Sequence, residues 1–425
     1  MLSSLRFRNF RLLWIGLGVS FTGTFVQQTA ILWHVSLLVP PGQKGLALGL
    51  VGLVRAVPVI IFSLIAGLAA DVIDRWTLML VTQIGGTIVA ALLAVLAFAH
   101  IQVVWPLYVL AAAGAAIGAF DPPSRQSMVA MLVPRHELSN AISLSTAMMQ
   151  TASVAGPAAA GLLIAQSSVG WAYVVDAVSF SAVIVALLLM RDVPATDRST
   201  VHARDQFSIA AMREGLSFVF REPVVRSTML IDFFATFFAS ATALLPIFAQ
   251  DILHVGATGY GLLSAAPAVG AVLATVAMMA IAPRIARQGV LLLWAVVAYG
   301  LATIAFGVST AFWLAFATFA MTGAADAVST VIRNVMRQLE TPDAMRGRMV
   351  GVNMVFFMGG PQLGELEAGL AAQWIGARLS VVTGGVGCLI ATAVIAAVTP
   401  ALTRYRPKVA RPAAAAPPAD PVSGA

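Results

Sequence analysis

Apolar residues form long runs that are separated by short polar stretches. A helix that crosses a lipid bilayer needs about 20 mostly apolar residues, and the pattern predicts twelve such helices. In the first half of the chain they cover residues 11–38, 46–70, 77–99, 103–131, 139–166 and 171–190. In the second half they cover residues 224–250, 258–282, 289–308, 311–336, 348–375 and 378–400. The predicted fold class is therefore an all-α integral membrane protein.

Several glycines, prolines and charged residues of the first half recur, in the same order, in the second half. The repeat mates are Gly52 and Pro58 with Gly261 and Pro267, Gly156-Pro157 with Gly360-Pro361, and Asp121, Ser124 and Arg125 with Asp326, Ser329 and Arg333. Two similar membrane-embedded halves are typical of proteins that rock about a central site. The sequence thus predicts two pseudo-symmetric six-helix bundles, residues 1–190 and 224–403.

The longest polar stretch between predicted helices covers residues 191–223. Its apolar positions follow helical spacing, with charged residues between them: Phe207, Ile209, Met212, Leu216, Val219 and Phe220. This pattern favours an amphipathic helix at the cytoplasmic surface that connects the two bundles; a flexible linker is the alternative. Residues 404–425 are rich in proline and alanine, a composition typical of a disordered tail.

Composition agrees with a membrane protein and disfavours a nucleic-acid partner. Hydrophobic residues make up 60% of the chain and charged residues only 10%, whereas soluble domains have roughly 25% charged residues. The net charge is +7. If the helices alternate from a cytoplasmic N-terminus, every basic residue except Lys44, Arg55 and Arg378 falls on the cytoplasmic side. This bias predicts that both termini are cytoplasmic and that the basic surplus faces anionic lipid.

The sequence has no nucleotide-binding loop, hydrolytic triad or metal-ligand cluster. The missing phosphate-binding loop argues against a built-in ATP motor, so an ion gradient is the expected source of energy. The single cysteine, Cys388, cannot form a disulfide within the chain. We therefore expect no cofactor, no metal and no enzymatic activity.

The segment between the second and third predicted helices, Gly67-Leu68-Ala69-Ala70-Asp71-Val72-Ile73-Asp74-Arg75, resembles the cytoplasmic loop signature of the major facilitator superfamily. The resemblance implies a cluster that latches a cytoplasmic gate in the outward-open state. After Arg75 the chain departs from the family pattern, because Trp76-Thr77-Leu78 replaces a run of basic residues. The expected gate residues are Gly67, Asp71, Asp74, Arg75, Asp121, Arg125 and Asp326, of which Asp121 and Arg125 have ion-pair spacing on a helix.

Four further segments resemble the branch of this superfamily that contains the bacterial enterobactin exporter and the macrolide efflux proteins. They are residues 8–14, 120–125, 215–218 and 341–348. In addition, Gly156, Pro157 and Gly161 resemble the glycine–proline signature of the superfamily's antiporters; a purely structural helix kink is the alternative. The resemblance implies export rather than import, by a monomeric multi-pass protein of the bacterial inner membrane.

Ionisable side chains inside a membrane are costly unless they are paired or hydrated, so each one is a functional candidate. Asp232 lies in the seventh predicted helix and is a candidate proton carrier; a structural hydrogen bond is the alternative. Glu365 and Glu367 lie two residues apart in the eleventh helix, so at most one of them is expected to face a cavity. One of them can instead pair with Arg55. Asp176, near the outer end of the sixth helix, is expected to be hydrated.

By the family fold, the first, fourth, seventh and tenth helices are expected to line a central cavity. Aromatic and methionine side chains can adapt their packing to bulky apolar ligands; ordinary helix packing is the alternative for each of them. The candidate contacts are Thr24, Gln27, Gln28, Arg55, Phe233, Phe237, Phe238 and Met321.

The residue patterns and the resemblance together predict a proton-coupled exporter of amphipathic small molecules, such as drugs or siderophores, that works by alternating access. Its expected partners are the substrate, protons and membrane lipid. A lipid or lysolipid flippase of the same fold is the alternative, and transport that persists without a proton gradient would favour it. A non-transporting receptor is a third hypothesis, which the intramembrane carboxylates disfavour.

Overall fold

The structure is a computed structural model that describes residues 3–191, 209–281, 285, 287–342 and 345–405. Within these residues every regular element is helical. Nine helical segments of the described residues are long and apolar enough to cross a membrane, by length and composition. Large apolar side chains also point outward, among them Met279, Trp313 and Trp374, as expected where lipid is the solvent.

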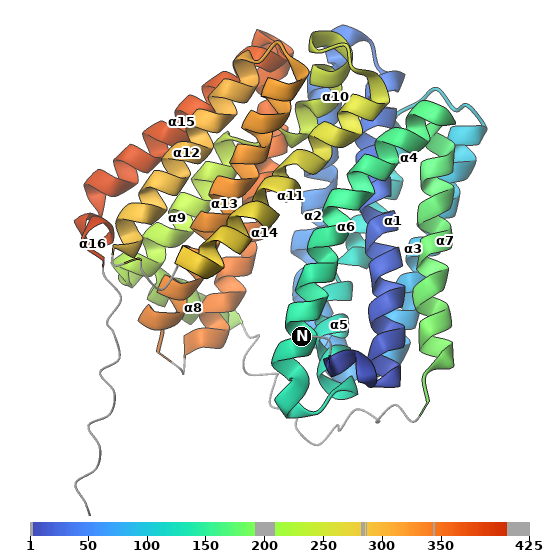
Figure 1. Ribbon diagram of the computed structural model, residues 1–425, viewed down its shortest axis with the longest axis horizontal. Helices are drawn as coiled ribbons and strands as arrows, with labels where there is room; N and C mark the ends of the chain where they lie inside the picture. Colours follow the sequence, from blue (N-terminus) through green and yellow to red (C-terminus); the bar gives the residue numbers. More distant parts are fainter. Residues whose placement is uncertain (1–2, 192–208, 282–284, 286, 343–344, 406–425) are drawn as a thin grey trace, which may run out of the picture.

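The helices form two groups (Figure 1). The N-terminal half contains α1 (Arg8–Leu38), α2 (Lys44–Val72), α3 (Arg75–Phe98), α4 (Trp105–Gly118), α5 (Asp121–Leu132), α6 (Leu138–Gln166) and α7 (Val169–Leu189), with the short helices η1 (Ser3–Arg6), η2 (Pro41–Gln43) and η3 (Arg135–Glu137). The C-terminal half contains α9 (Pro223–Phe238), η6 (Thr242–Leu244), α10 (Leu245–Ile247), η7 (Phe248–Ile252), α11 (Gly256–Ile281), α12 (Gln288–Val308), α13 (Phe312–Glu340), α14 (Arg346–Ile375), α15 (Ala377–Val398) and α16 (Pro400–Thr403).

Two of the predicted continuous helices are interrupted. The helix predicted for residues 103–131 is split into α4 and α5, and α5 starts with Asp121-Pro122-Pro123. Proline has no backbone N–H and fits best in the first turn of a helix, so two prolines in succession favour the start of a new helix. The helix predicted for residues 224–250 ends at Phe238 and continues as η6, α10 and the π-helical turn η7.

The repeated prolines lie at matching places in the two halves. Pro58 lies inside α2 and its repeat mate Pro267 inside α11. Pro157 lies inside α6 and its mate Pro361 inside α14. Neighbouring membrane helices can satisfy the backbone groups that such prolines leave free. The four helices that carry these prolines are also the ones that join the halves.

The two halves meet along two helix pairs, α2 with α14 and α6 with α11. Their contacts lie toward the end of the molecule where α2 and α11 begin and α6 and α14 end, which we call the joined end. At the opposite end, where α1 begins and α13 ends, the two groups of helices spread apart (Figure 1). We call this the open end.

The amphipathic helix α8 (Ile209–Arg221) lies at the open end against the C-terminal half. The Glu214 carboxylate pairs with the Arg348 guanidinium of α14 at 2.8 Å, and Gly215 packs on the backbone of the same arginine. Val219 is buried with Val225 and Met349. These contacts attach α8 to the C-terminal half. The rest of the connector, residues 192–208, and the predicted disordered tail from residue 406 onward lie outside the described residues.

Candidate functional site

A buried lysine joins the halves at the joined end. Lys44, the first residue of α2, contacts both carboxylate oxygens of Asp251 in η7 at 2.9 and 3.0 Å, and its Nζ donates to Gln250 Oε1 at 2.8 Å. Gln250 in turn donates from Nε2 to Ser36 Oγ of α1 at 2.7 Å. The Lys44 side chain is 8% exposed and the Asp251 side chain 41%. The charged contact is therefore half shielded from water and bridges the two halves.

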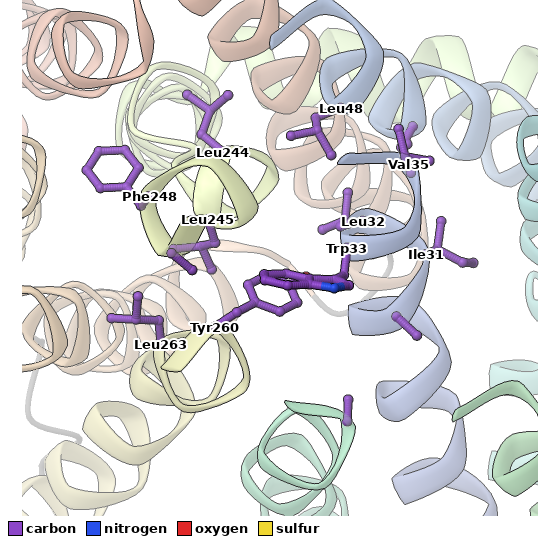
Figure 2. Close-up of a cluster of buried hydrophobic side chains, with 14 of the residues drawn as sticks. Ile31, Leu32, Trp33, Val35, Leu48, Leu244, Leu245, Phe248, Tyr260 and Leu263 are labelled. Carbon is purple, nitrogen blue, oxygen red and sulfur yellow. The ribbon is translucent and has the colours of Figure 1, made fainter. Parts of the chain in front are cut away.

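An aromatic pair crosses the same boundary (Figure 2). The rings of Trp33 in α1 and Tyr260 in α11 stack with centroids 5.0 Å apart, and the Tyr260 hydroxyl donates to the Thr29 carbonyl oxygen at 2.8 Å. Leu48 of α2 and Leu244 of η6 belong to the same apolar cluster. This core thus contains residues of both halves, and separating the halves here would expose it to water.

Glycines allow the paired helices to touch backbone to backbone. A Cβ atom added to Gly369 of α14 would lie 2.6 Å from Gly49 Cα of α2, and one added to Gly161 of α6 would lie 2.8 Å from Gly261 Cα of α11. Small residues at helix contacts are a common means of close association in membranes. The sequence repeat accounts for some of these close contacts, because Gly52 of α2 and its repeat mate Gly261 of α11 both face a helix of the other half.

A cavity of about 300 Å³ lies in the N-terminal half. Helices α1 to α7 all contribute to its wall, and Gln362 of α14 contributes from the other half. Polar amides and two arginines line it beside aromatic rings: Gln27, Gln28, Gln83, Arg55, Arg125, Phe21, Phe25 and Phe180. Gln362 Oε1 is buried and has no hydrogen-bond partner among the described residues. The cavity therefore offers both apolar surface and hydrogen-bonding groups to a ligand.

Only some of the residues predicted to line the substrate cavity lie at the cavity found in the structure. Thr24, Gln27, Gln28 and Arg55 line this cavity. The predicted phenylalanines instead lie together on α9, where Phe233 stacks on Phe237 with centroids 5.7 Å apart, and Phe238 packs against the glycines of α15. Met321 is 57% exposed on α13. A ligand contact for Phe233, Phe237, Phe238 or Met321 stays a prediction.

The predicted ion pair at the start of α5 is present. Arg125 Nε lies 3.4 Å from Asp121 Oδ2, and the Arg125 guanidinium also lies over the Phe21 ring of α1, 4.6 Å from its centroid. All three residues line the cavity. A guanidinium over an aromatic face is attracted by the ring quadrupole, so Arg125 ties α5 to α1 at the cavity wall.

The C-terminal half holds a buried cluster of charges. Arg333 of α13 lies 2.8 Å from Asp232 Oδ1 of α9 and 3.3 Å from Asp326 Oδ1 of its own helix. The side chains of Asp232 and Arg333 are 3% and 2% exposed, that of Asp326 46%. Asp232, a predicted proton carrier, thus has a buried cation as its direct partner, which the sequence did not indicate.

A second arginine extends this cluster to α14. Arg337 donates from Nε to the Arg333 carbonyl oxygen at 3.2 Å and contacts Asn334 and, on α14, Asn353. Arg333 and Arg337, which belong to the basic surplus predicted for the cytoplasmic side, do not face lipid. They are 1% and 3% exposed. Arg333 pairs with two carboxylates inside the half, and Arg337 donates hydrogen bonds to a carbonyl oxygen and two amide oxygens there.

The other intramembrane carboxylates have different surroundings. Glu365 of α14 faces α2, where a Cβ added to Gly52 would lie 2.8 Å from Glu365 Oε2, and Arg55 lies about one helical turn after Gly52 on α2. Glu367 is half-buried. The expectation that Asp176 is hydrated is wrong: it is 0% exposed, and the Ser179 hydroxyl lies 3.4 Å from its Oδ1. Close packing of α7 on Gly23 of α1 excludes water there.

The predicted gate signature is only partly described. Gly67 and Asp71 belong to the backbone of α2, but the Asp71 side chain and the packing around Gly67 lie outside the described part of the structure. Asp74 caps the start of α3, where its Oδ2 accepts from the Thr77 N–H at 3.1 Å, a common stabilisation of a helix N-terminus. Arg75 is the first residue of that helix. A gating role for these residues stays a prediction.

The glycine–proline segment of α6 packs against two neighbours. A Cβ added to Gly156 would lie 2.4 Å from Phe25 Cβ of α1, while Gly161 contacts α11. This position links the cavity helix α1 to the boundary between the halves. No group of three or more metal-ligating side chains occurs among the described residues.

Comparison with solved structures identifies the fold. A bacterial homologue of the human lysosomal transporter Spinster, in an inward-facing and unoccupied conformation, is 17% identical with a TM-score of 0.73, over 95% of this chain and 99% of that one. A bacterial homologue of the iron transporter ferroportin, in an inward-facing state, is 16% identical with a TM-score of 0.68, over 92% of this chain and 98% of that one. Both likenesses concern the fold alone.

Sequence comparison identifies the family. Residues 1–416 match the family described as transmembrane secretion effector. An uncharacterised MFS-type transporter, YfiS of Bacillus subtilis, is 29% identical over 177 residues, 41% of either chain. The enterobactin exporter EntS of Shigella boydii is 27% identical over 275 residues, 65% of this chain and 64% of that one. The matched regions thus span less than two thirds of these relatives. The chain belongs to the transmembrane secretion effector family of the major facilitator superfamily, whose members are multi-pass membrane transporters rather than enzymes.

Proposed function

We propose that this transporter is a proton-coupled exporter of amphipathic small molecules that works by alternating access. The observation that carries the proposal is the one-sided attachment of the halves. The contact of Lys44 with Asp251 and the stack of Trp33 on Tyr260 hold them together at one end, whereas the groups of helices spread apart at the other. Rocking of two such halves about a central site exposes that site to each side of the membrane in turn.

The orientation follows from the placement of charge. We infer twelve spans, formed by α1, α2, α3, α4 with α5, α6, α7, α9 with α10 and η7, and α11 to α15. The first and last described helices, η1 and α16, then lie at the open end, together with most of the basic residues. Basic loops stay on the cytoplasmic side, so the open end is cytoplasmic and the structure is inward-open. The protein works as a monomer in the bacterial inner membrane, with the bundles 1–190 and 224–403 as its two moving parts.

The cavity supports an amphipathic substrate. Its aromatic wall suits an apolar body, and the amides of Gln27 and Gln28 with the guanidinium of Arg55 suit a polar group. Gln362 brings the other half into contact with the same ligand, so rocking changes the ligand's surroundings. The enterobactin exporters among the relatives support export as the direction.

Proton coupling is assigned to the intramembrane carboxylates Asp232, Glu365 and Glu367. A buried carboxylate that loses its proton must keep a cation nearby, because an uncompensated charge inside a membrane protein is costly. Asp232 has Arg333 as such a cation, and Glu365 packs on α2 at Gly52, about one helical turn before Arg55. Proton uptake from outside and release inside therefore change the balance of charge in the protein, and this favours one state and then the other.

The test uses purified protein in liposomes with an imposed pH gradient and the amphipathic dye Hoechst 33342 as the probe. Wild type is expected to move the dye against the proton flow, and Asp232→Asn or Glu367→Gln is expected to abolish this movement while the protein remains inserted. Arg6→Gln, which removes an exposed ion pair inside one half, is the control. Undiminished proton-driven transport in both variants would remove the assignment. Transport that persists in wild type after the gradient is collapsed would favour the flippase instead.

A further inference from the structure

The repeated aspartate and arginine residues make different contacts in the two halves. Arg125 and Arg333 are repeat mates that accompany the mates Asp121 and Asp326. Each arginine reaches the first long helix of its half. In the N-terminal half Arg125 meets the uncharged ring of Phe21 on α1. In the C-terminal half Arg333 meets the carboxylate of Asp232 on α9. The C-terminal copy therefore carries one additional titratable group at an otherwise similar position.

Arg333 is shared between two carboxylates with unequal access to water. Its Nη1 holds the buried Asp232, and its Nη2 lies near the half-exposed Asp326 and donates to Thr330 Oγ1 at 2.7 Å. Asp232 Oδ2 and Arg333 Nε are buried and have no hydrogen-bond partner among the described residues. Oδ2 is thus the carboxylate oxygen that can take up a proton without first losing a contact.

Building on the proton-coupled export proposed above, we propose that Arg333 is a switch between Asp232 and Asp326, and that the C-terminal half senses protons while the N-terminal half binds the substrate. A proton bonds to Asp232 Oδ2 and makes this group a neutral acid. The guanidinium then keeps only the Asp326 carboxylate as its anion and moves toward the exposed side of the cluster. When the proton leaves Oδ2, the restored carboxylate draws Arg333 back.

Other polar and charged groups surround the cluster but do not replace Asp232. Arg337 of α13 donates to the Arg333 carbonyl oxygen, and the hydroxyl of Tyr299 on α12 donates to the carbonyl oxygen of Ala239, the residue that follows α9, at 3.4 Å. The helices α14 and α15 bring Asn353 and Cys388 to this region. The remaining charged residues of the elements packed on α9 are Arg226 on α9 itself, Arg213, Glu214 and Arg221 on α8, Glu340 on α13, Arg346, Arg348, Glu365 and Glu367 on α14, and Arg378 on α15.

The cluster has a direct connection to the boundary between the halves. Arg337 accompanies Arg333 through its backbone contact and also holds Asn353 of α14. The same α14 contacts α2 at Gly369 and brings Gln362 to the substrate cavity. Because α9, which carries Asp232, packs directly on α14, a change in the Asp232–Arg333 pair acts on the helix that joins the halves and lines the cavity. The two functions lie in different halves, and α14 connects them.

The experiment measures the conformational response to pH without substrate. Spin labels are placed at Arg135→Cys and Gln338→Cys, exposed positions at the open end of either half, while the native Cys388 is buried. Distance distributions are recorded in lipid nanodiscs between pH 5 and 8. Wild type is expected to change its distribution with pH, Asp232→Asn to lose this response, and Asp232→Glu to retain it. Asp121→Asn, the matched change in the N-terminal half, is expected to keep the response whatever its effect on transport.

Each outcome bears on the inference. A pH response in Asp232→Asn equal to that of wild type would overturn it, as would loss of the response in Asp121→Asn alone. If Asp232→Asn does not insert, the charge-neutral double variant Asp232→Asn/Arg333→Gln takes its place, and a retained response there overturns the inference equally. A wild type that responds to pH without proton-driven dye transport would contradict the proposed function and not the switch. Proton-driven transport without a pH response would contradict the switch alone.

Discussion

Replacing Lys44 by methionine isolates the polar contact that holds the joined end. Methionine keeps most of the buried aliphatic length but removes the ammonium group, and with it the contacts to Asp251 and Gln250. Because the Asp251 side chain is 41% exposed, it can regain water when Lys44 is lost. The variant therefore does not leave a fully buried unpaired charge. The expected loss is that of a half-shielded ion pair with its hydrogen bond.

The free energy that this contact contributes to the closed joined end can be estimated from the exposed fractions of the Lys44 and Asp251 side chains. Hydrogen bonds to charged groups contribute about 1.5–3 kcal/mol and exposed ion pairs about 0–1 kcal/mol. A half-shielded contact lies between them, at about 1–2 kcal/mol, which multiplies the ratio of open to closed joined ends about five- to thirty-fold. The stacked pair of Trp33 and Tyr260 remains, so the closed state is weakened and not abolished.

The assay uses a cysteine that is reached only when the joined end opens. Ala249 is fully buried there, so the rate at which a maleimide reacts with Ala249→Cys in nanodiscs reports the open fraction. Lys44→Met is expected to raise this rate about five- to thirty-fold. Arg6→Gln removes the contact of Arg6 with Glu137, which lies inside one half, and should leave the rate unchanged. Equal rates in wild type and Lys44→Met would refute the reasoning, because the lysine would then not hold the halves together.

Two further changes test the packing and the buried charges. Gly369→Val is expected to open the joined end and lower the melting temperature, because its Cβ would lie 2.6 Å from Gly49 Cα; Gly351→Val on the same helix meets open space, and a similar effect there would refute the argument. Arg333→Gln is expected to destabilise the protein by about 3–5 kcal/mol, since it leaves Asp232 buried without its cation. In thermal unfolding of detergent-solubilised protein, the double variant Arg333→Gln/Asp232→Asn should recover much of that loss, and a double variant no more stable than the single one would contradict this account.

Ion pairs within one helix could be predicted from the sequence, whereas ion pairs between distant helices could not. The pair of Asp121 and Arg125 could be predicted because both residues lie on one helix at a spacing that helical geometry brings together. The contacts of Lys44 with Asp251 and of Arg333 with Asp232 join residues that are far apart in sequence. No local periodicity indicates such pairs. For Arg333, only its place as the repeat mate of Arg125 suggested that it lies in a matching environment.

By itself, the sequence determined that lipid is the solvent, that the chain is helical, and that two similar halves follow each other, because these properties depend on apolar run lengths and on a repeat that can be read along the chain. The tertiary structure alone decided which end is joined, that the cavity lies within the N-terminal half, and that the buried Asp232 faces Arg333. These features depend on how helices pack across the molecule. One glycine at a helix contact can determine where two helices meet, and one long arginine side chain can determine which carboxylate is paired. Neither produces a periodic pattern in the sequence.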